Sequence, residues 1–221
     1  MGSPASAVAG PSAGVPAVAL AVVGSIAVAV AWNLVLRGRA SVWATMAACL
    51  GALGALSLFT GEVHVGEAVP LATMVALGLG AGVTLYLATA AFLSMTRGWR
   101  LLARHTTALY RRRGGLSLGA AVLLAAGVSA AGEELFWRGV VQGVAGGALG
   151  DLPGAVLAWA AYVGANAFSG SVPVVLGAVV GGGVWAALAA WTGGVVASLA
   201  CHAMWTALMV ALPPVPLEDP A

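Results

Sequence analysis

Three charged residues lie close together in GEELFWRGVVQG, residues 132–143, within an otherwise uncharged stretch. On a helix, Glu134 and Arg138 are four residues apart and share one face, where they can pair. Glu133 is rotated by about 100° from Glu134 and reaches Arg138 poorly. One carboxylate is therefore neutralised and the other has no partner. An unpaired carboxylate of this kind is typical of a ligand site, a proton relay or a catalytic base.

These charges belong to a chain with the composition of an integral membrane protein. Hydrophobic residues make up 61% of the 221 residues, charged residues make up 7%, and the mean hydropathy is +1.02. A charged side chain inside a membrane span costs roughly 3 kcal/mol, so such residues face inward and find partners. An ion pair that only fixes helix packing accounts for Glu134 and Arg138, but it leaves Glu133 without a role.

The helices that must position these residues are visible as long apolar runs. The runs predict an all-α fold, a polytopic transmembrane bundle of about seven helices. The predicted spans are 14–36, 41–60, 68–95, 116–142, 153–169, 172–191 and 193–213. No repeat of fixed period and no linker marks a second domain, so residues 1–221 are expected to form a single integral membrane domain.

The distribution of charge predicts how the bundle is oriented. All nine basic residues are arginines, and eight of them lie in the predicted loops after the first and third spans. The positive-inside rule places these loops in the cytoplasm. Arginine without lysine, together with many Ala, Gly and Val residues, is typical of a GC-rich genome and favours a bacterial source. In a bacterium, the expected location of the chain is the inner membrane. The net charge of +2 is too small for a nucleic-acid surface, so we expect the lipid bilayer and no nucleic acid as partner.

The charged stretch also resembles a known family motif. EELFWRG resembles the EExxxR signature of the CPBP intramembrane proteases, which include the type 2 CAAX prenyl endopeptidase and bacterial Abi-type proteins. In TGGVVASLACHAMWT, His202 and Thr206 match a later HxxxN motif of the family, with threonine in place of asparagine. In AYVGANAF, Tyr162 and Asn166 stand at the aromatic and histidine positions of an FxxxH motif. The resemblance covers about the last half of the chain.

The resemblance implies an intramembrane endopeptidase whose catalytic helices are contained in residues 116–213. In the family the first glutamate of EExxxR activates water, so Glu133 takes that role here. The site residues that the resemblance assigns are Glu133, Glu134, Arg138, Asn166, His202 and Thr206.

Two of these residues depart from the family pattern. The amide of Asn166 can hold a water molecule, but it cannot take up a proton as an imidazole can. The hydroxyl of Thr206 offers one donor where an asparagine amide offers two. Within the predicted spans His202 is the one histidine, and with Glu133 it is too small a set for a zinc site, which usually has three or four ligands. We therefore predict no metal and no cofactor.

The depth of the site residues predicts the kind of substrate. At about 1.5 Å per residue, Glu133 lies about 25 Å from the cytoplasmic start of its span, and Asn166 and His202 lie about 18 Å and 13 Å from the outer ends of theirs. A site in the middle-to-outer bilayer suits a membrane-anchored protein substrate, cut near its transmembrane segment or its C-terminal sorting signal as in myxosortase-like relatives. A CAAX substrate requires a site that faces the cytoplasm.

A second class of function fits the same residues. In a non-catalytic member of the family, such as a scaffold, an immunity protein or a small transporter, Glu133 and Arg138 would bind a ligand or relay protons. The two classes differ in what Glu133 does. An enzyme in which Glu133 becomes Gln loses turnover, a scaffold keeps its phenotype, and a proton-coupled transporter loses coupling.

Overall fold

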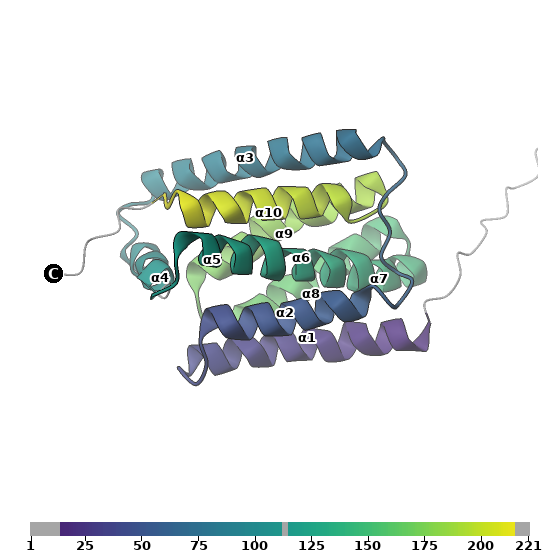
Figure 1. Cartoon of the computed structure of the whole chain (residues 1–221), viewed down its shortest axis with the longest axis horizontal. Helices are drawn as coiled ribbons and strands as arrows, with labels where there is room; N and C mark the ends of the chain where they lie inside the picture. Colours follow the sequence, from purple (N-terminus) through teal and green to yellow (C-terminus); the bar gives the residue numbers. More distant parts are fainter. Residues whose placement is uncertain (1–13, 112–114, 215–221) are drawn as a thin grey trace, which may run out of the picture.

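The apolar runs form long helices that lie side by side in the computed structural model, which describes residues 14–111 and 115–214 (Figure 1). Within these residues the regular structure is helical and no strand is present. The elements are α1 (Val15–Leu36), α2 (Val42–Ser57), α3 (Leu71–Met95), α4 (Arg100–Arg111), α5 (Leu118–Val122), η1 (Leu123–Ala130), α6 (Ala131–Glu133), η2 (Glu134–Val141), α7 (Gln142–Leu149), α8 (Asp151–Ala167), α9 (Val172–Thr192) and α10 (Val196–Ala211). The predicted all-α helical bundle is confirmed.

Several of these helices have the length and composition of membrane spans. Among the described residues, four segments are long and apolar enough to cross a bilayer: Val15–Leu36, Leu71–Met95, Leu118–Leu149 and Val172–Thr192. The apolar helices α2 and α10 are shorter, with 16 residues each, which gives each about 24 Å of length. These features describe a multi-pass membrane protein.

The two ends of the bundle carry opposite charge. The α1–α2 turn and α4 lie at one end, on the left in Figure 1, and the α2–α3 connection lies at the other. The first end, called the arginine end below, carries Arg37, Arg39, Arg97, Arg100 and Arg104. The second, called the acidic end, carries Glu62, Glu67 and Asp151. A cytoplasmic location of the arginine end stays a prediction of the positive-inside rule.

Helix α4 is an element that the apolar runs did not predict. Residues 97–113 were expected to be a cytoplasmic loop, but residues 100–111 form a helix. Its buried side chains Leu102 and Thr106 are four residues apart, while Arg104 is exposed. This pattern is typical of an amphipathic helix at a membrane surface, and it is invisible to a search for apolar runs of about 20 residues.

Glycines bring the backbones of two helix pairs into contact. A Cβ on Gly54 of α2 would lie 2.6 Å from the Cα of Gly132, and one on Gly132 would overlap the carbonyl group of Leu50. On α3, a Cβ on Gly78 or on Gly82 would overlap a backbone carbonyl of α10. Small residues that let helix backbones approach are the usual means of close packing in membranes. Here they fix α2 against Glu133's helix and α3 against the helix that carries His202.

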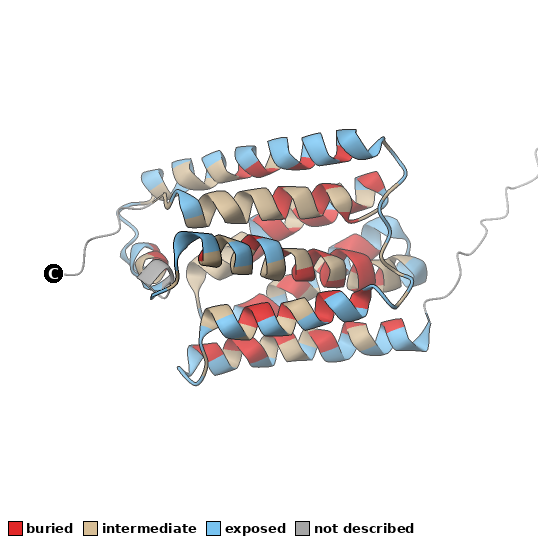
Figure 2. Ribbon diagram, viewed as in Figure 1, coloured by how far each residue is buried: buried red, intermediate tan, exposed pale blue. Residues whose placement is uncertain are grey.

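Burial is concentrated where the helices face one another (Figure 2). The aromatic side chains of Phe136, Trp137 and Trp185 are among the largest that are fully buried. Polar and charged residues lie in the same interior: Glu133, Glu134, Arg138, Gln142, Asn166 and His202 are all buried. The centre of the bundle is therefore both aromatic and charged.

Candidate active site

The charged stretch lies in the middle of one continuous helix, Leu118–Leu149, called the site helix below. Two π-helical stretches, η1 and η2, flank the short α-helical piece that ends at Glu133. A π-helix turns less per residue than an α-helix, and such stretches are frequent at functional sites. The directions of Glu133 and of the side chains after it therefore differ from those of an ideal α-helix.

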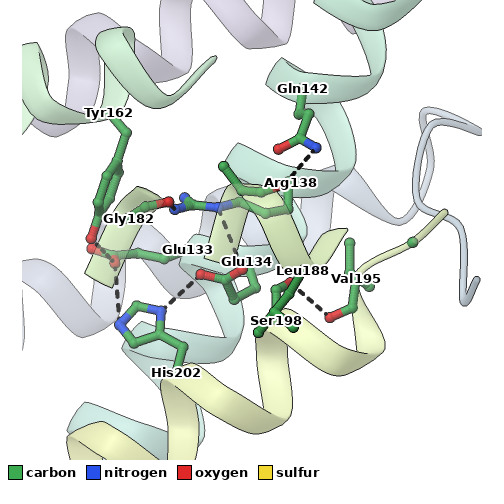
Figure 3. A network of polar contacts seen from close by, with 12 residues as sticks. Glu133, Glu134, Arg138, Gln142, Tyr162, Gly182, Leu188, Val195, Ser198 and His202 are labelled. Carbon is green, nitrogen blue, oxygen red and sulfur yellow. Dashed lines mark hydrogen bonds and ion pairs between the residues drawn. The ribbon is translucent and has the colours of Figure 1, made fainter. Parts of the chain in front are cut away.

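Glu134 is the most enclosed of the site residues, because its side chain is 0% exposed. Its Oε1 lies 2.8 Å from Nδ1 of His202, and its Oε2 lies 3.6 Å from Nε of Arg138 (Figure 3). The predicted pairing of Glu134 with Arg138 is therefore present, but the closer partner is His202. Glu134 links the site helix to α10.

Arg138 is held from three directions. Its Nη2 donates a hydrogen bond of 2.9 Å to the carbonyl oxygen of Gly182 on α9. Its guanidinium carbon lies 4.7 Å from the centre of the Tyr162 ring and 5.6 Å from that of Trp185, within cation–π range. Arg138 thus neutralises Glu134 from a fixed position and ties the site helix to α8 and α9.

Glu133 faces different neighbours. Its Oε2 accepts a hydrogen bond of 2.9 Å from the hydroxyl of Tyr162 and lies 3.7 Å from Nε2 of His202. Its side chain keeps 10% of its surface exposed. Arg138 pairs with Glu134 rather than with Glu133, as the helix geometry predicted.

His202 lies between the two carboxylates, with Nδ1 toward Glu134 and Nε2 toward Glu133 (Figure 3). Its ring stacks on Trp185, with 3.5 Å between the ring centres and 15° between the planes. With Glu134 ionised, Nδ1 keeps its proton and donates a hydrogen bond to the carboxylate, so Nε2 presents its lone pair toward Glu133. The stacked tryptophan and Glu134 together fix this orientation.

Among the residues that the structure describes, no hydrogen bond joins Asn166 to Glu133. Its Oδ1 accepts a hydrogen bond of 3.0 Å from Nε1 of Trp32, and its Nδ2 donates to the carbonyl oxygen of Tyr162 at 3.0 Å. It is the last residue but one of α8, about 22 Å from Asp151, and so lies toward the arginine end rather than in the middle-to-outer half. Its link to the carboxylates passes through Tyr162.

Thr206 lies on α10, four residues after His202. Its Oγ1 is buried, and no hydrogen-bond partner for it exists among the residues that the structure describes. A buried hydroxyl without a partner costs about 1–3 kcal/mol, so it calls for an explanation.

Three contact residues of the site were not predicted as such from the sequence. Tyr162 was noted only as an aromatic residue, although its hydroxyl was a signal that it forms hydrogen bonds. Trp185 and Gly182 lie in an apolar run that gave no signal, since a stacking ring and a backbone carbonyl look like ordinary packing there. All three become visible only once α8 and α9 are placed beside the site helix.

A cavity of about 270 Å³, lined by both polar and apolar residues, extends from the acidic end to Arg138. Glu62, His64 and Asp151 line it near the acidic end, and Arg138 and Gln142 line it at depth. Its lining includes the guanidinium of Arg138 but none of Glu133, Glu134 and His202, so it reaches one side of the site.

Across residues 14–111 and 115–214, no three His, Cys, Asp or Glu side chains are grouped in a way that could hold a metal ion.

Comparison with known proteins identifies the region that carries the site. Residues 115–208 match the family model described as type II CAAX prenyl endopeptidase Rce1-like. The matched region contains every site residue that the sequence predicted, and the resemblance to the CPBP proteases is thereby confirmed. No curated protein and no solved structure matches the chain. The match supports an endopeptidase of the CAAX type in broad terms.

Proposed function

We propose that this Rce1-like membrane protein hydrolyses a peptide bond within the bilayer and that Glu133 activates the attacking water molecule. One observation carries the proposal: Oε2 of Glu133 and Nε2 of His202 lie 3.7 Å apart in the buried centre of the bundle. This separation is too long for a direct hydrogen bond, but one water molecule can contact both groups, and through it they can share the proton transfers of hydrolysis. The family match supports protease activity, and the glutamate chemistry is the finer part of the proposal.

In the proposed reaction, Glu133 takes a proton from water while the water oxygen bonds to the carbonyl carbon of the substrate. The electron pair of the carbonyl double bond moves to its oxygen, which becomes an oxyanion. When the carbonyl re-forms, the bond between carbon and nitrogen breaks, and the proton passes to the leaving nitrogen. Glu133 thus acts as the base when water attacks, and the proton that it has taken up is the one donated when the nitrogen leaves.

His202 assists these proton transfers in the proposed mechanism. Glu134 accepts a hydrogen bond from Nδ1 and so keeps Nε2 directed toward Glu133. A buried carboxylate that orients a histidine and stabilises its protonated form is a recurrent catalytic arrangement. Arg138 offsets the charge of Glu134, so that two adjacent carboxylates can be ionised in one interior.

Thr206 and Asn166 take supporting roles in the proposal. The buried hydroxyl of Thr206, which has no partner among the described residues, is available to donate a hydrogen bond to the oxyanion of the substrate. Asn166 holds the backbone of Tyr162 and is itself held by Trp32. Its proposed role is therefore to position α8 rather than to bind water.

We propose a membrane-anchored protein of a bacterial inner membrane as the substrate. A site in the middle of the site helix, with a cavity toward the acidic end, suits cleavage near a transmembrane or C-terminal sorting segment that is reached from the non-cytoplasmic face. In this proposal a substrate of the CAAX kind is disfavoured, because its modified end lies in the cytoplasm.

The decisive experiment compares the membrane proteomes of cells that carry the wild-type protein or the Glu133→Gln variant. We expect one or more proteins to keep a terminal hydrophobic segment only in the variant cells. Glu67→Gln, the same change at an exposed residue of the acidic end, is the matched control and is expected to behave as wild type. If a stably inserted Glu133→Gln variant leaves the proteome unchanged and rescues a deletion phenotype, the non-catalytic function replaces this one. Loss of proton-coupled uptake without any change in processing identifies a transporter.

The orientation is tested by labelling single cysteines with a membrane-impermeant maleimide in intact cells. Cys49 and Cys201 are first replaced by alanine, and one cysteine is then introduced at Glu67 or at Arg97. We expect labelling at position 67 and protection at position 97. The opposite pattern places the acidic end in the cytoplasm and makes a CAAX-type substrate the better proposal.

A further inference from the structure

The α8 side chain that contacts Glu133 is Tyr162. Its hydroxyl lies 2.9 Å from Oε2 of Glu133, and an ionised carboxylate only accepts hydrogen bonds, so the hydroxyl is the donor. Asn166, four residues later, has both ends of its amide engaged elsewhere, by Trp32 and by the backbone of Tyr162 itself. The place beside the carboxylate that was predicted for Asn166, at the histidine position of the family motif, is thus taken by a phenol.

We propose that Tyr162 is a positioning residue for the hydrolysis: it holds Oε2 of Glu133 and leaves Oε1 to meet the water molecule. The inference rests on the proposed function. It is supported by the unequal surroundings of the two oxygens, since Oε2 has Tyr162 and His202 as neighbours. Among the hydrogen bonds of residues 14–111 and 115–214, none involves Oε1.

The surroundings of Tyr162 fix its hydroxyl in place. The residue is 4% exposed, and its ring packs edge-on against Trp137 with 5.5 Å between the ring centres. The Arg138 guanidinium lies over its face, and a Cβ on Gly182 would lie 2.8 Å from the ring. A ring enclosed in this way cannot swing away from Glu133, so the carboxylate is held in one orientation before the substrate arrives.

The proposed step needs no proton from the phenol. The proton of the attacking water goes to Oε1 of Glu133 and later to the leaving nitrogen of the substrate. Tyr162 keeps its own proton throughout, and no bond to it forms or breaks. Its contribution is the hydrogen bond that orients Glu133 and stabilises its charge.

The test uses purified Tyr162→Phe protein and, as probe, the membrane protein whose processing stops in Glu133→Gln cells. We expect kcat to fall about 10- to 100-fold, because a hydrogen bond to a charged group is lost, while KM stays within about twofold. Tyr86→Phe is the matched control. It removes the same atom from a tyrosine that donates to the carbonyl oxygen of Leu212 far from the site, and it is expected to keep the wild-type kcat.

A second measurement separates a hydrogen-bonding role from a space-filling one. Fluorinated tyrosines at position 162 keep the ring in place but make the hydroxyl a more acidic donor, and we expect kcat to change in step with that acidity. A constant kcat across the series, or full activity of Tyr162→Phe beside an inactive Glu133→Gln, overturns this inference and leaves the proposed function standing. If Glu133→Gln is also fully active, or no processed protein is found, the proposed function fails and this inference fails with it.

Discussion

Glu133 and Glu134 are neighbours in the chain, but the regions around them differ. Glu134 is fully enclosed, and its two oxygens face a histidine and an arginine. Glu133 is 10% exposed, and its one short hydrogen bond comes from Tyr162. Two adjacent positions of one helix can therefore hold a fixed ionic centre and the carboxylate that is proposed to react, because their side chains leave the helix in different directions.

The largest expected effect is a loss of stability when the enclosed carboxylate of Glu134 is removed. Glu134→Ala leaves Arg138 and His202 without their acidic partner inside the bundle, and breaking a buried ion pair in this way costs about 3–5 kcal/mol. We expect little protein to accumulate in the membrane and the remainder to unfold at much lower denaturant in detergent. Glu67→Ala, at an exposed site, is the control. Wild-type stability of Glu134→Ala contradicts the role given to Glu134.

The next largest effect is expected at Glu133, where a substitution should lower turnover but leave stability nearly unchanged. Glu133→Gln is expected to reduce turnover by about 10²- to 10⁴-fold, the contribution typical of a general base. Its free energy of unfolding should stay within about 1 kcal/mol of wild type, because the amide oxygen still accepts from Tyr162. Turnover and denaturant unfolding measured on one preparation decide this. A stability loss as large as that of Glu134→Ala removes the contrast between the two carboxylates.

A smaller effect is expected at Thr206, on the side of the site that is proposed to receive the oxyanion. Thr206→Val should lower kcat about 10²-fold, the lower end of the loss expected when one donor to the oxyanion is removed. It should not lower stability, because the hydroxyl has no partner among the described residues. Thr206→Asn restores a donor and should recover activity. If the valine variant is less stable yet equally active, the hydroxyl serves packing instead.

The smallest expected effect on turnover concerns the hydrogen bond between Trp32 of α1 and Asn166 of α8. Trp32→Phe removes the donor to Oδ1 of Asn166 and should cost about 1–3 kcal/mol of stability, because a buried acceptor is left without a partner. Turnover should fall by no more than about threefold, since Tyr162 keeps its other contacts. Thermal unfolding and kinetics of the same sample measure both. A loss of turnover as large as that of Tyr162→Phe would show that Asn166 acts directly in catalysis.

The helices were predictable because each apolar run is long enough to be read as a span. The prediction 172–191 differs from α9 by one residue at one end, and 14–36 differs from α1 in the same way. Helix α4 was missed because its polar face breaks the apolar pattern. A search for apolar runs thus finds helices that are apolar all round and overlooks an amphipathic one.

The chemistry of the site was predictable in part. Spacing alone showed that Glu134 pairs with Arg138 and that Glu133 does not. The contact of His202 with both carboxylates joins residues 68 or more positions apart, which no local pattern reveals. Asn166 was assigned from one aromatic residue and one spacing, whereas the rotation of α8 decides which of its side chains reaches Glu133. That rotation is a property of packing.

The glycine contacts described above also determine how a cleavable segment can arrive. The backbones of α2 and the site helix touch at Gly54 and Gly132, directly before Glu133, and those of α3 and α10 approach at Gly78 and Gly82. A helix is about 10 Å wide. A substrate helix could therefore not pass between α2 and the site helix, or between α3 and α10, unless the two backbones in contact moved apart. A substrate helix is therefore not expected to enter from the lipid between the helices of either pair. A polypeptide that reaches Glu133 must pass between other helices or descend as an unwound strand from an end of the bundle.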